Sequence, residues 1–270
     1  MADRQSYGAR FASQRMAANY RFRPDYSSEV YDILAGLLRG QPRALLDAGC
    51  GPGKIVHGLV NQIDRADAVD PSEPMLHIAR SFPEGRDPRI RWVCARIEDA
   101  ELRPPYGLIV AGASIHWMEL DRVLPRFKES LAPGAFLAVL DGDAPIDPPW
   151  EGEATRFMLD FLEKLEGERP RWWANASQRL QQQILDHPAF ERAGRVISKP
   201  VRVARNIADF LQCEHSRATW AEDHLGETRS TQFDEGLTRI LAPFAIDDIL
   251  TFSVQTRIEW GRVRSPSAAR

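Results

Sequence analysis

The chain reads Asp47-Ala48-Gly49-Cys50-Gly51-Pro52-Gly53 directly after the apolar run Ala44-Leu45-Leu46. The apolar run predicts a buried strand. The spaced glycines predict a tight turn, because glycine accepts positive φ and has no Cβ to keep a ligand away from the backbone. A helical pattern of apolar residues begins at once, with Ile55, Val56, Leu59, Val60 and Ile63 on one face. The N–H groups of the first turn of such a helix have no partner within it, so they are available to a ligand at the glycine turn.

An acidic residue ends the next predicted strand. Residues 66–69 are predicted as this strand, and Asp70 follows them. A carboxylate at that position can accept hydrogen bonds from both hydroxyls of a ribose. Pro71 and Met75 come next and could enclose an adenine ring, although Met75 fits a hydrophobic core equally well. Together these residues predict an adenosine-containing ligand.

The spacing of the glycines separates two kinds of cofactor. A nicotinamide-binding turn reads G-x-G-x-x-G, and Lys54 stands where its third glycine would lie. Asp47 would repel a pyrophosphate, whereas it could pair with an ammonium group. The pattern D-x-G-x-G-x-G, with an acid at the end of the next strand, resembles motifs I and II of class I S-adenosylmethionine (SAM) methyltransferases. The alternative for Asp47 is a carboxylate that only caps the turn.

Strand and helix patterns alternate through residue 140. Further strands are predicted over residues 90–94, 108–111 and 135–140. This alternation predicts an α/β fold with a doubly wound, Rossmann-like parallel sheet. Residues 195–204 and 251–260 show two more strand patterns. Residues 142–194, which precede both, carry helical stripes that predict a helical lid inserted after strand five.

Three stretches of the chain resemble the class I methyltransferases related to trans-aconitate methyltransferase and the ubiquinone-pathway methyltransferases. They are residues 20–26, which read Tyr-Arg-Phe-Arg-Pro-Asp-Tyr, the glycine turn through Asp70, and Gly112-Ala113-Ser114-Ile115-His116-Trp117. The resemblance implies a seven-stranded sheet of order 3-2-1-4-5-7-6 with strand seven antiparallel. Residues 195–204 would be strand six, and residues 250–261 strand seven.

The same resemblance divides the chain into functional segments. Residues 1–43 would be N-terminal helices that close over the cofactor, and residues 44–141 the SAM-binding core. Residues 142–194 would be the helical lid, residues 195–262 would complete the sheet, and residues 263–270 would be a flexible tail.

The resemblance also implies the residues of the cofactor site. Tyr20 and Arg23 would close over the amino-acid tail of SAM, and Asp47 would approach its ammonium group. The remaining candidates are Gly49, Cys50, Gly51, Gly53, Asp70, Pro71, Met75, Ile97, Glu98, Gly112 and Ala113. The adenine-edge residues Ile97 and Glu98 depart from the family pattern because Arg96 precedes them, and a solvated turn residue is the alternative for Glu98.

The substrate side of the site is predicted from position and residue type. His116 follows strand four, at the edge of the sheet where ligands of open α/β sheets bind, and its intrinsic pKa near neutrality suits a general base. The alternative is a histidine that only positions substrate or holds the loop. Trp117 could line the methyl channel. Three further tryptophans of the lid would suit a flat or apolar substrate: Trp150, Trp172 and Trp173.

These features predict methyl transfer to a small-molecule acceptor, by O-methylation of a carboxylate or hydroxyl. C-methylation of an activated carbon and a non-catalytic SAM-binding protein are the alternatives. The formal net charge of −3 over 270 residues disfavours a dedicated nucleic-acid binder. The three cysteines lack metal-ligand spacing, so we expect no metal and a reducing, cytoplasmic setting without a membrane span. The oligomeric state is not predicted.

Overall fold

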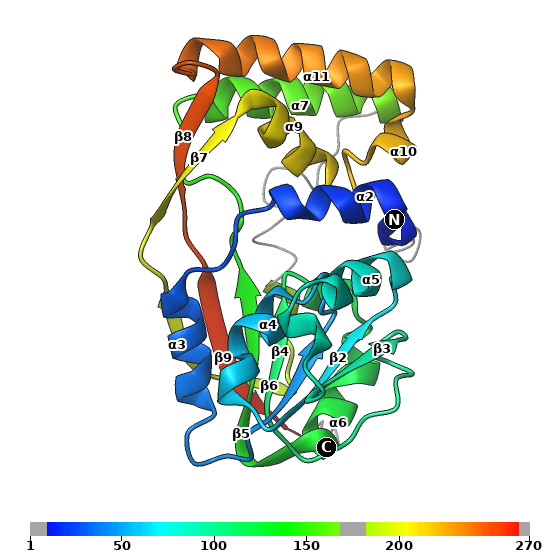
Figure 1. Cartoon of the computed structure of the whole chain (residues 1–270), viewed down its shortest axis with the longest axis vertical. Coiled ribbons are helices and arrows are strands. Elements are labelled where there is room, and N and C mark those ends of the chain that lie inside the picture. The colour runs from blue at the N-terminus through cyan, green and yellow to red at the C-terminus, as the bar shows by residue number, and fades with distance from the viewer. Residues whose placement is uncertain (1–9, 168–181, 265–270) are drawn as a thin grey trace. The chain divides into compact units, whose positions relative to one another are not determined.

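The computed structural model describes residues 10–167 and 182–264, which belong to two compact units (Figure 1). Unit 1 comprises Met1–Pro24, Asp143–Gln178 and Pro200–Gln255, and unit 2 comprises Asp25–Gly142, Arg179–Lys199 and Thr256–Arg270. This division differs from the expected one. The segment expected as a lid is shared between both units, and residues 200–255 lie in unit 1 rather than with the main sheet.

Unit 2 contains a seven-stranded sheet of order β3-β2-β1-β4-β5-β9-β6. Strands β1 to β5 pair in parallel, whereas β9 is antiparallel to both β5 and β6. The predicted order 3-2-1-4-5-7-6 is therefore confirmed, with β9 as its antiparallel strand seven. The strands are β1 (Ala44–Ala48), β2 (Arg65–Asp70), β3 (Ile90–Cys94), β4 (Tyr106–Gly112), β5 (Leu131–Asp141), β6 (Phe190–Ile197) and β9 (Arg257–Val263).

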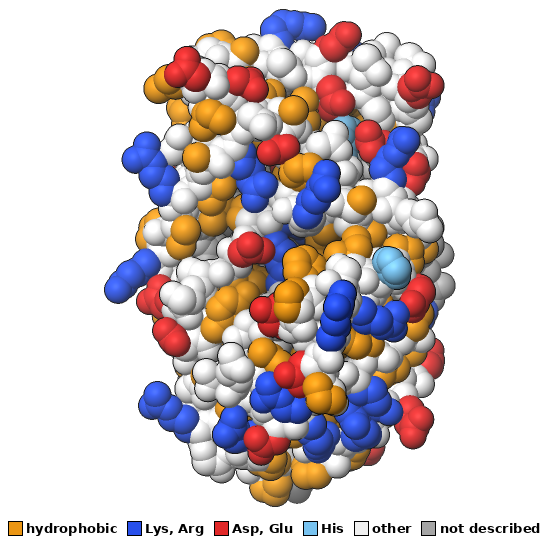
Figure 2. All heavy atoms as spheres, viewed as in Figure 1, with side chains coloured by type: hydrophobic (Ala, Val, Ile, Leu, Met, Phe, Trp, Pro, Cys, Tyr) orange, Lys and Arg blue, Asp and Glu red, His pale blue; other side chains and the backbone are white. Residues whose placement is uncertain are grey.

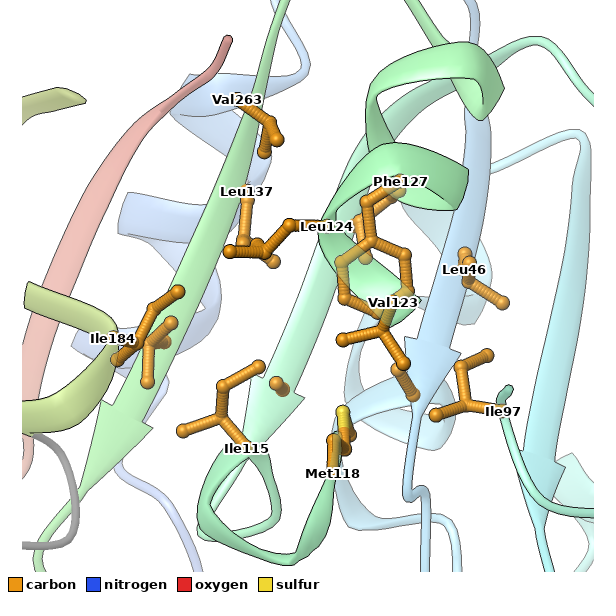
Figure 3. Close-up of a cluster of buried hydrophobic side chains, with 14 of the residues drawn as sticks. Leu46, Ile97, Ile115, Met118, Val123, Leu124, Phe127, Leu137, Ile184 and Val263 are labelled. Carbon is orange, nitrogen blue, oxygen red and sulfur yellow. The ribbon is translucent and has the colours of Figure 1, made fainter. Parts of the chain in front are cut away.

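Helices cover both faces of this sheet, as the alternation of strands and helices predicts (Figure 1). Successive residues of β1 point to opposite faces. Leu45 packs with α3 (Ser28–Leu37), α4 (Lys54–Leu59) and α5 (Glu73–Ser81). Leu46 packs with the cluster that includes α6 (Leu120–Ser130), whose Val123, Leu124 and Phe127 reach toward the sheet (Figure 3). The central strands are buried on both sides, which explains their nearly continuous apolar sequence.

The strand expected over residues 251–260 is two strands. Strand β8 (Ile249–Val254) pairs with β7 (Val201–Asn206) in a two-stranded sheet of unit 1, whereas β9 belongs to unit 2. The strand expected over residues 195–204 is divided in the same way between β6 and β7. The Ser198 N–H donates to the carbonyl of Thr256 at 2.8 Å, and the Thr256 N–H donates to the Ser198 hydroxyl at 2.9 Å. The second bond puts a side-chain hydroxyl where a backbone carbonyl would continue the ladder, at the point where the two sheets separate. A period of two continues across the break, so the sequence pattern did not reveal it.

Unit 1 has its own hydrophobic core. Phe210, Phe233, Leu237, Trp150 and Trp220 are among its buried residues. Among the described residues, the α-helices of this unit are α2 (Gln14–Asn19), α7 (Glu151–Glu166), α9 (Ile207–His215), α10 (Glu222–Leu225) and α11 (Glu227–Leu241). Its short 3-10 helices are η1 (Arg10–Ala12), η2 (Tyr20–Phe22) and η7 (Ala242–Phe244). No helix within residues 10–167 or 182–264 is long and apolar enough to cross a membrane.

Candidate functional site

The turn after β1 is built from glycines in the left-handed region. Gly49, Gly51 and Gly53 have φ values of 70°, 53° and 83°. The N–H groups of Gly49 and Cys50 both donate to the Val69 carbonyl, at 2.8 and 3.0 Å, and so bind the turn to the end of β2. A Cβ on Gly49 would lie 2.5 Å from the Cβ of Ser114. Glycine is therefore required at position 49 both by the backbone angle and by the close approach of the loop after β4.

Asp70 is held at the end of β2 by two backbone donors. Its Oδ2 accepts from the Gly51 N–H at 2.8 Å, and its Oδ1 accepts from the Ser72 N–H at 2.9 Å. Burial raises the pKa of this carboxyl, although both amide hydrogen bonds act in the opposite direction. Each carboxylate oxygen has a second lone pair, so the group can accept two further hydrogen bonds in a fixed orientation.

Asp47 is the fully buried acid of the site. Its Oδ2 accepts from the Val56 N–H at 3.2 Å, whereas its Oδ1 is buried without a hydrogen-bond partner. Burial raises the pKa of Asp47 to about 7, and the nearby Asp70 adds to the rise. A buried acceptor without a donor is costly, so this oxygen fits a ligand that brings a positively charged donor.

The loop after β4 is fixed to the loop after β1. The Ser114 hydroxyl donates to the Ala48 carbonyl at 2.6 Å, and Ala113 adopts the left-handed φ of 51° that non-glycine residues rarely occupy. The 3-10 helix η5 (Ile115–Trp117) follows, and Ile115 and Met118 anchor it in the hydrophobic cluster (Figure 3). These anchors leave His116 and Trp117 half-buried on the loop, with ring centroids 4.8 Å apart.

Glu98 and Ile97 lie near the start of α6, where each has a structural role. Glu98 Oε1 accepts from the Glu119 N–H at 2.9 Å, and its Oε2 accepts from Arg96 at 3.3 Å. Ile97 is buried in the hydrophobic cluster shown in Figure 3. Glu98 is thus no solvated turn residue: it caps the first turn of α6. Contact of this pair with adenine stays a prediction.

The residues expected around adenine differ in exposure. Pro71 is exposed at the end of β2, whereas Met75 is 2% exposed and lies in the first turn of α5. Its N–H donates to the Ser72 hydroxyl, which caps that helix. Because Met75 is buried, packing already accounts for it, as the alternative interpretation held.

Tyr20, Arg23 and Trp150 belong to unit 1. Arg23 stacks on the Tyr20 ring at 4.2 Å, donates to the Ser216 hydroxyl at 2.7 Å and forms an ion pair with Asp143 at 3.2 Å. Trp150 is 3% exposed and packs against several phenylalanines, so its place in the core explains it without a substrate. Trp172 and Trp173 lie outside the described residues.

Unit 2 therefore brings together four of the expected features: the glycine turn, Asp47, Asp70 and the loop that carries His116. The sequence analysis did not predict the role of Ser114, whose hydroxyl fastens this loop to β1. Its position two residues before His116 could have indicated that it helps to fix the loop. Among the described residues, no group of three or more His, Cys, Asp or Glu side chains could hold a metal ion.

Comparison with known proteins agrees with this geometry. Residues 45–134 match the family model described as a methyltransferase domain. The chain is 34% identical over 127 residues to trans-aconitate 2-methyltransferase of Methylobacterium nodulans, which covers 46% of this chain and 48% of the relative. It is 31% identical over 120 residues to the malonyl-[acyl-carrier protein] O-methyltransferase of Anoxybacillus flavithermus, covering 44% of this chain and 45% of the relative.

Among solved structures, a candidate type II methyltransferase from Anaeromyxobacter dehalogenans matches 90% of this chain and 99% of its own, with a TM-score of 0.64 and 21% identity. This match concerns the fold. The chain spans a little under half the length of the curated relatives described above. Residues 45–134 thus match a methyltransferase domain, and the sheet of unit 2 has the strand order expected from the resemblance to class I SAM-dependent methyltransferases.

Proposed function

We propose that the chain is an enzyme that transfers a methyl group from SAM to a small-molecule acceptor, with O-methylation of a carboxylate as the reaction. The observation that carries this proposal is the pair of acids at adjacent strand ends: Asp70 fixed by two amides, and Asp47 with one buried oxygen unpartnered. A ribose diol suits the first acid and an ammonium group suits the second. SAM carries both groups.

The residues of unit 2 would divide the work as follows. Asp70 would accept hydrogen bonds from the ribose, and Asp47 would pair with the ammonium group. Gly49, Gly51 and Gly53 would let the backbone approach the ligand closely. SAM supplies an activated methyl group on a cationic sulfur, so the protein's remaining tasks are alignment and the exclusion of water.

The choice of a carboxylate acceptor draws on two relatives. One is named for trans-aconitate and the other for a malonyl group, and both of these compounds carry carboxylates. A carboxylate acceptor is already deprotonated at neutral pH, so His116 would hydrogen-bond the acceptor rather than remove a proton. A hydroxyl or carbon acceptor would instead require His116 as a base.

The function is tested by incubating the full chain with methyl-labelled SAM and a panel of small carboxylic acids, phenols and activated carbon acids. We expect label in a base-labile methyl ester of one of the carboxylic acids. Label in a base-stable carbon-bound methyl would establish C-methylation instead. If SAM binds and no acceptor is labelled across the panel, the non-catalytic alternative replaces the enzyme.

The role of His116 follows from the same assay. We expect His116→Ala to lower turnover at least tenfold while SAM affinity changes less than twofold, because one hydrogen bond to a charged acceptor is lost. His116→Gln serves as the matched variant, since its amide can still donate but cannot act as a base. Retained turnover in the Gln variant supports positioning of a carboxylate, whereas loss in both variants supports a general base.

A further inference from the structure

Tyr26 lies beside the end of β4. A Cβ built on Gly112, the last residue of that strand, would lie 3.0 Å from the Tyr26 hydroxyl oxygen and 2.4 Å from the Ile55 side chain. Any larger residue at position 112 would therefore displace Tyr26 or Ile55. The Tyr26 ring is half-buried and packs against the hydrophobic cluster on the α3 and α4 face of the sheet. The absence of a side chain at Gly112 makes room for the phenol at a strand end of unit 2.

The segment that carries Tyr26 is fastened to the helix that follows the glycine turn. Asp25 forms an ion pair with Lys54 at 2.7 Å, and Lys54 is the first residue of α4. Tyr31 lies in α3, the helix that follows Tyr26, and its hydroxyl donates to the carbonyl of Lys54 at 3.1 Å. The Tyr26 and Tyr31 rings meet edge to face, with centroids 6.4 Å apart. Residues before and after Tyr26 in the chain thus both contact Lys54, at the N-terminus of α4.

Strand order and register put Tyr26 on the same face of the sheet as Asp47. In β1, Asp47 pairs with Val110 of β4, and Gly112 lies two residues further along β4. Leu45 and Val110 pack in the same cluster as Tyr26, so the period of two puts Asp47 and Gly112 on that face as well. The unpartnered Asp47 oxygen and the Tyr26 hydroxyl therefore lie on the same face of the sheet, near the carboxyl ends of β1 and β4.

Tyr26, at the end of β4, is two strands away from Asp70, the acid proposed to bind the ribose. Asp70 ends β2, and β1 lies between β2 and β4 in the sheet. Two strand spacings amount to roughly 10 Å, which is the scale of the distance from the ribose to the far end of the amino-acid chain in an S-adenosyl ligand. The reversal of strand order between β1 and β4 is also where open α/β sheets bind ligands.

We propose that Tyr26 is a further ligand-binding residue, whose hydroxyl hydrogen-bonds the zwitterionic amino-acid end of the S-adenosyl ligand beside Asp47. The inference rests on the proposed function of the same site. A phenol both donates and accepts, so it suits a group that carries a carboxylate and an ammonium. Tyr26 lies within the stretch 20–26 but is not among the residues that the family resemblance implies for the cofactor site.

The test compares two ligands that share the adenosine part and differ in the amino-acid end. S-adenosylhomocysteine has the zwitterion, and 5′-methylthioadenosine lacks it. We expect Tyr26→Phe to weaken S-adenosylhomocysteine about tenfold, as for one hydrogen bond to a charged group, while methylthioadenosine changes less than twofold. Affinities come from calorimetry, with methylthioadenosine measured by displacement of S-adenosylhomocysteine.

Tyr31→Phe is the matched control. It also removes a tyrosine hydroxyl from this aromatic pair, but the Tyr31 hydroxyl donates to the backbone carbonyl of Lys54. We expect it to change both affinities by one common factor. If Tyr26→Phe also shifts both ligands equally, or shifts neither, the inference is overturned while the proposed function stands. If the wild-type chain binds neither ligand, the proposed function itself fails.

Discussion

At the scale of single residues, Asp47 is the group whose charge should depend most on the ligand. Its carboxyl is fully buried, receives one amide hydrogen bond and has a pKa raised to about 7, chiefly by burial. A positive ligand group favours the ionised form, so binding releases a proton wherever the free acid is protonated. Burial also raises the pKa of Asp70, but two amide hydrogen bonds oppose the rise there.

This difference predicts pH-dependent affinity. Below the raised pKa of Asp47, ligand binding must deprotonate the carboxyl, so affinity rises as pH rises toward 7. We expect the dissociation constant for S-adenosylhomocysteine to fall roughly tenfold between pH 5.5 and 7, measured by calorimetry in buffers of different ionisation enthalpy. The Asp47→Asn variant, which cannot titrate, should bind more weakly and with a flat profile. An unchanged slope in that variant would assign the titration to another group.

At the scale of elements, the glycine turn combines two demands that can be separated. Gly49 needs both a left-handed backbone and room for Ser114, whereas Gly40 has φ 74° with nothing within 4 Å of its hypothetical Cβ. We expect Gly49→Ala to lower the free energy of unfolding by about 3 kcal/mol, from backbone strain plus overpacking. Gly40→Ala should cost about 1 kcal/mol, from backbone strain alone.

Chemical denaturation of both variants measures this difference. Ligand affinity should drop in Gly49→Ala and stay unchanged in Gly40→Ala. Equal losses of stability in the two variants would show that the loop after β4 can move away from the turn.

The helices of unit 1 contain a buried histidine whose partners fix its charge. His215 lies at the end of α9, and its two ring nitrogens meet the Trp220 carbonyl at 2.6 Å and the Asp234 carboxylate of α11 at 2.7 Å. Both partners can accept, so this arrangement favours a ring that donates from both nitrogens, which is the imidazolium form. Burial lowers the pKa of His215, but the bonds to Asp234 and Trp220 outweigh it, and the pKa is raised overall.

A raised pKa in the folded state sets the sign of the pH effect. The stabilisation is fully present below the unfolded histidine pKa of about 6.5 and is lost as pH rises through the higher folded value. We expect Asp234→Asn to lower the free energy of unfolding by about 2 kcal/mol near pH 6 and by less at pH 9. Thermal unfolding across this range measures it. A penalty in the Asn variant that stays constant with pH would mean that His215 is neutral.

The elements also show what sequence patterns can and cannot establish. The glycine turn and Asp70 were predictable because backbone angle and strand-end chemistry depend on local sequence. The break between β8 and β9 was not, because alternation continues through Gln255 while hydrogen bonding changes partner. Trp150 illustrates a third case: an aromatic residue has the same sequence signature in a core as in a binding site.

At the scale of the whole molecule, the formal net charge is −3, and basic and acidic side chains lie among one another on the face drawn in Figure 2. Figure 2 shows arginine and lysine side chains interspersed with acids, with more basic groups toward the end of unit 2 where the parallel strands begin. Several arginines of unit 2 are engaged within the protein. Arg65 donates to the Pro105 carbonyl at 2.7 Å, Arg43 to the Gln62 carbonyl at 3.0 Å, and Arg91 to Asp67 at 2.9 Å. The first two bonds join residues at or before the amino ends of the parallel strands, and the third joins β3 to β2.

The central claim is that unit 2 holds an S-adenosyl ligand at the carboxyl ends of β1, β2 and β4. Calorimetric titration of the full chain with S-adenosylhomocysteine, with NADH as comparison and Asp70→Ala as variant, tests this most directly. We expect one S-adenosylhomocysteine per chain, no heat with NADH, and a loss of about 1–3 kcal/mol of binding free energy in the variant. Binding of NADH without S-adenosylhomocysteine, or an unchanged affinity in Asp70→Ala, would contradict it.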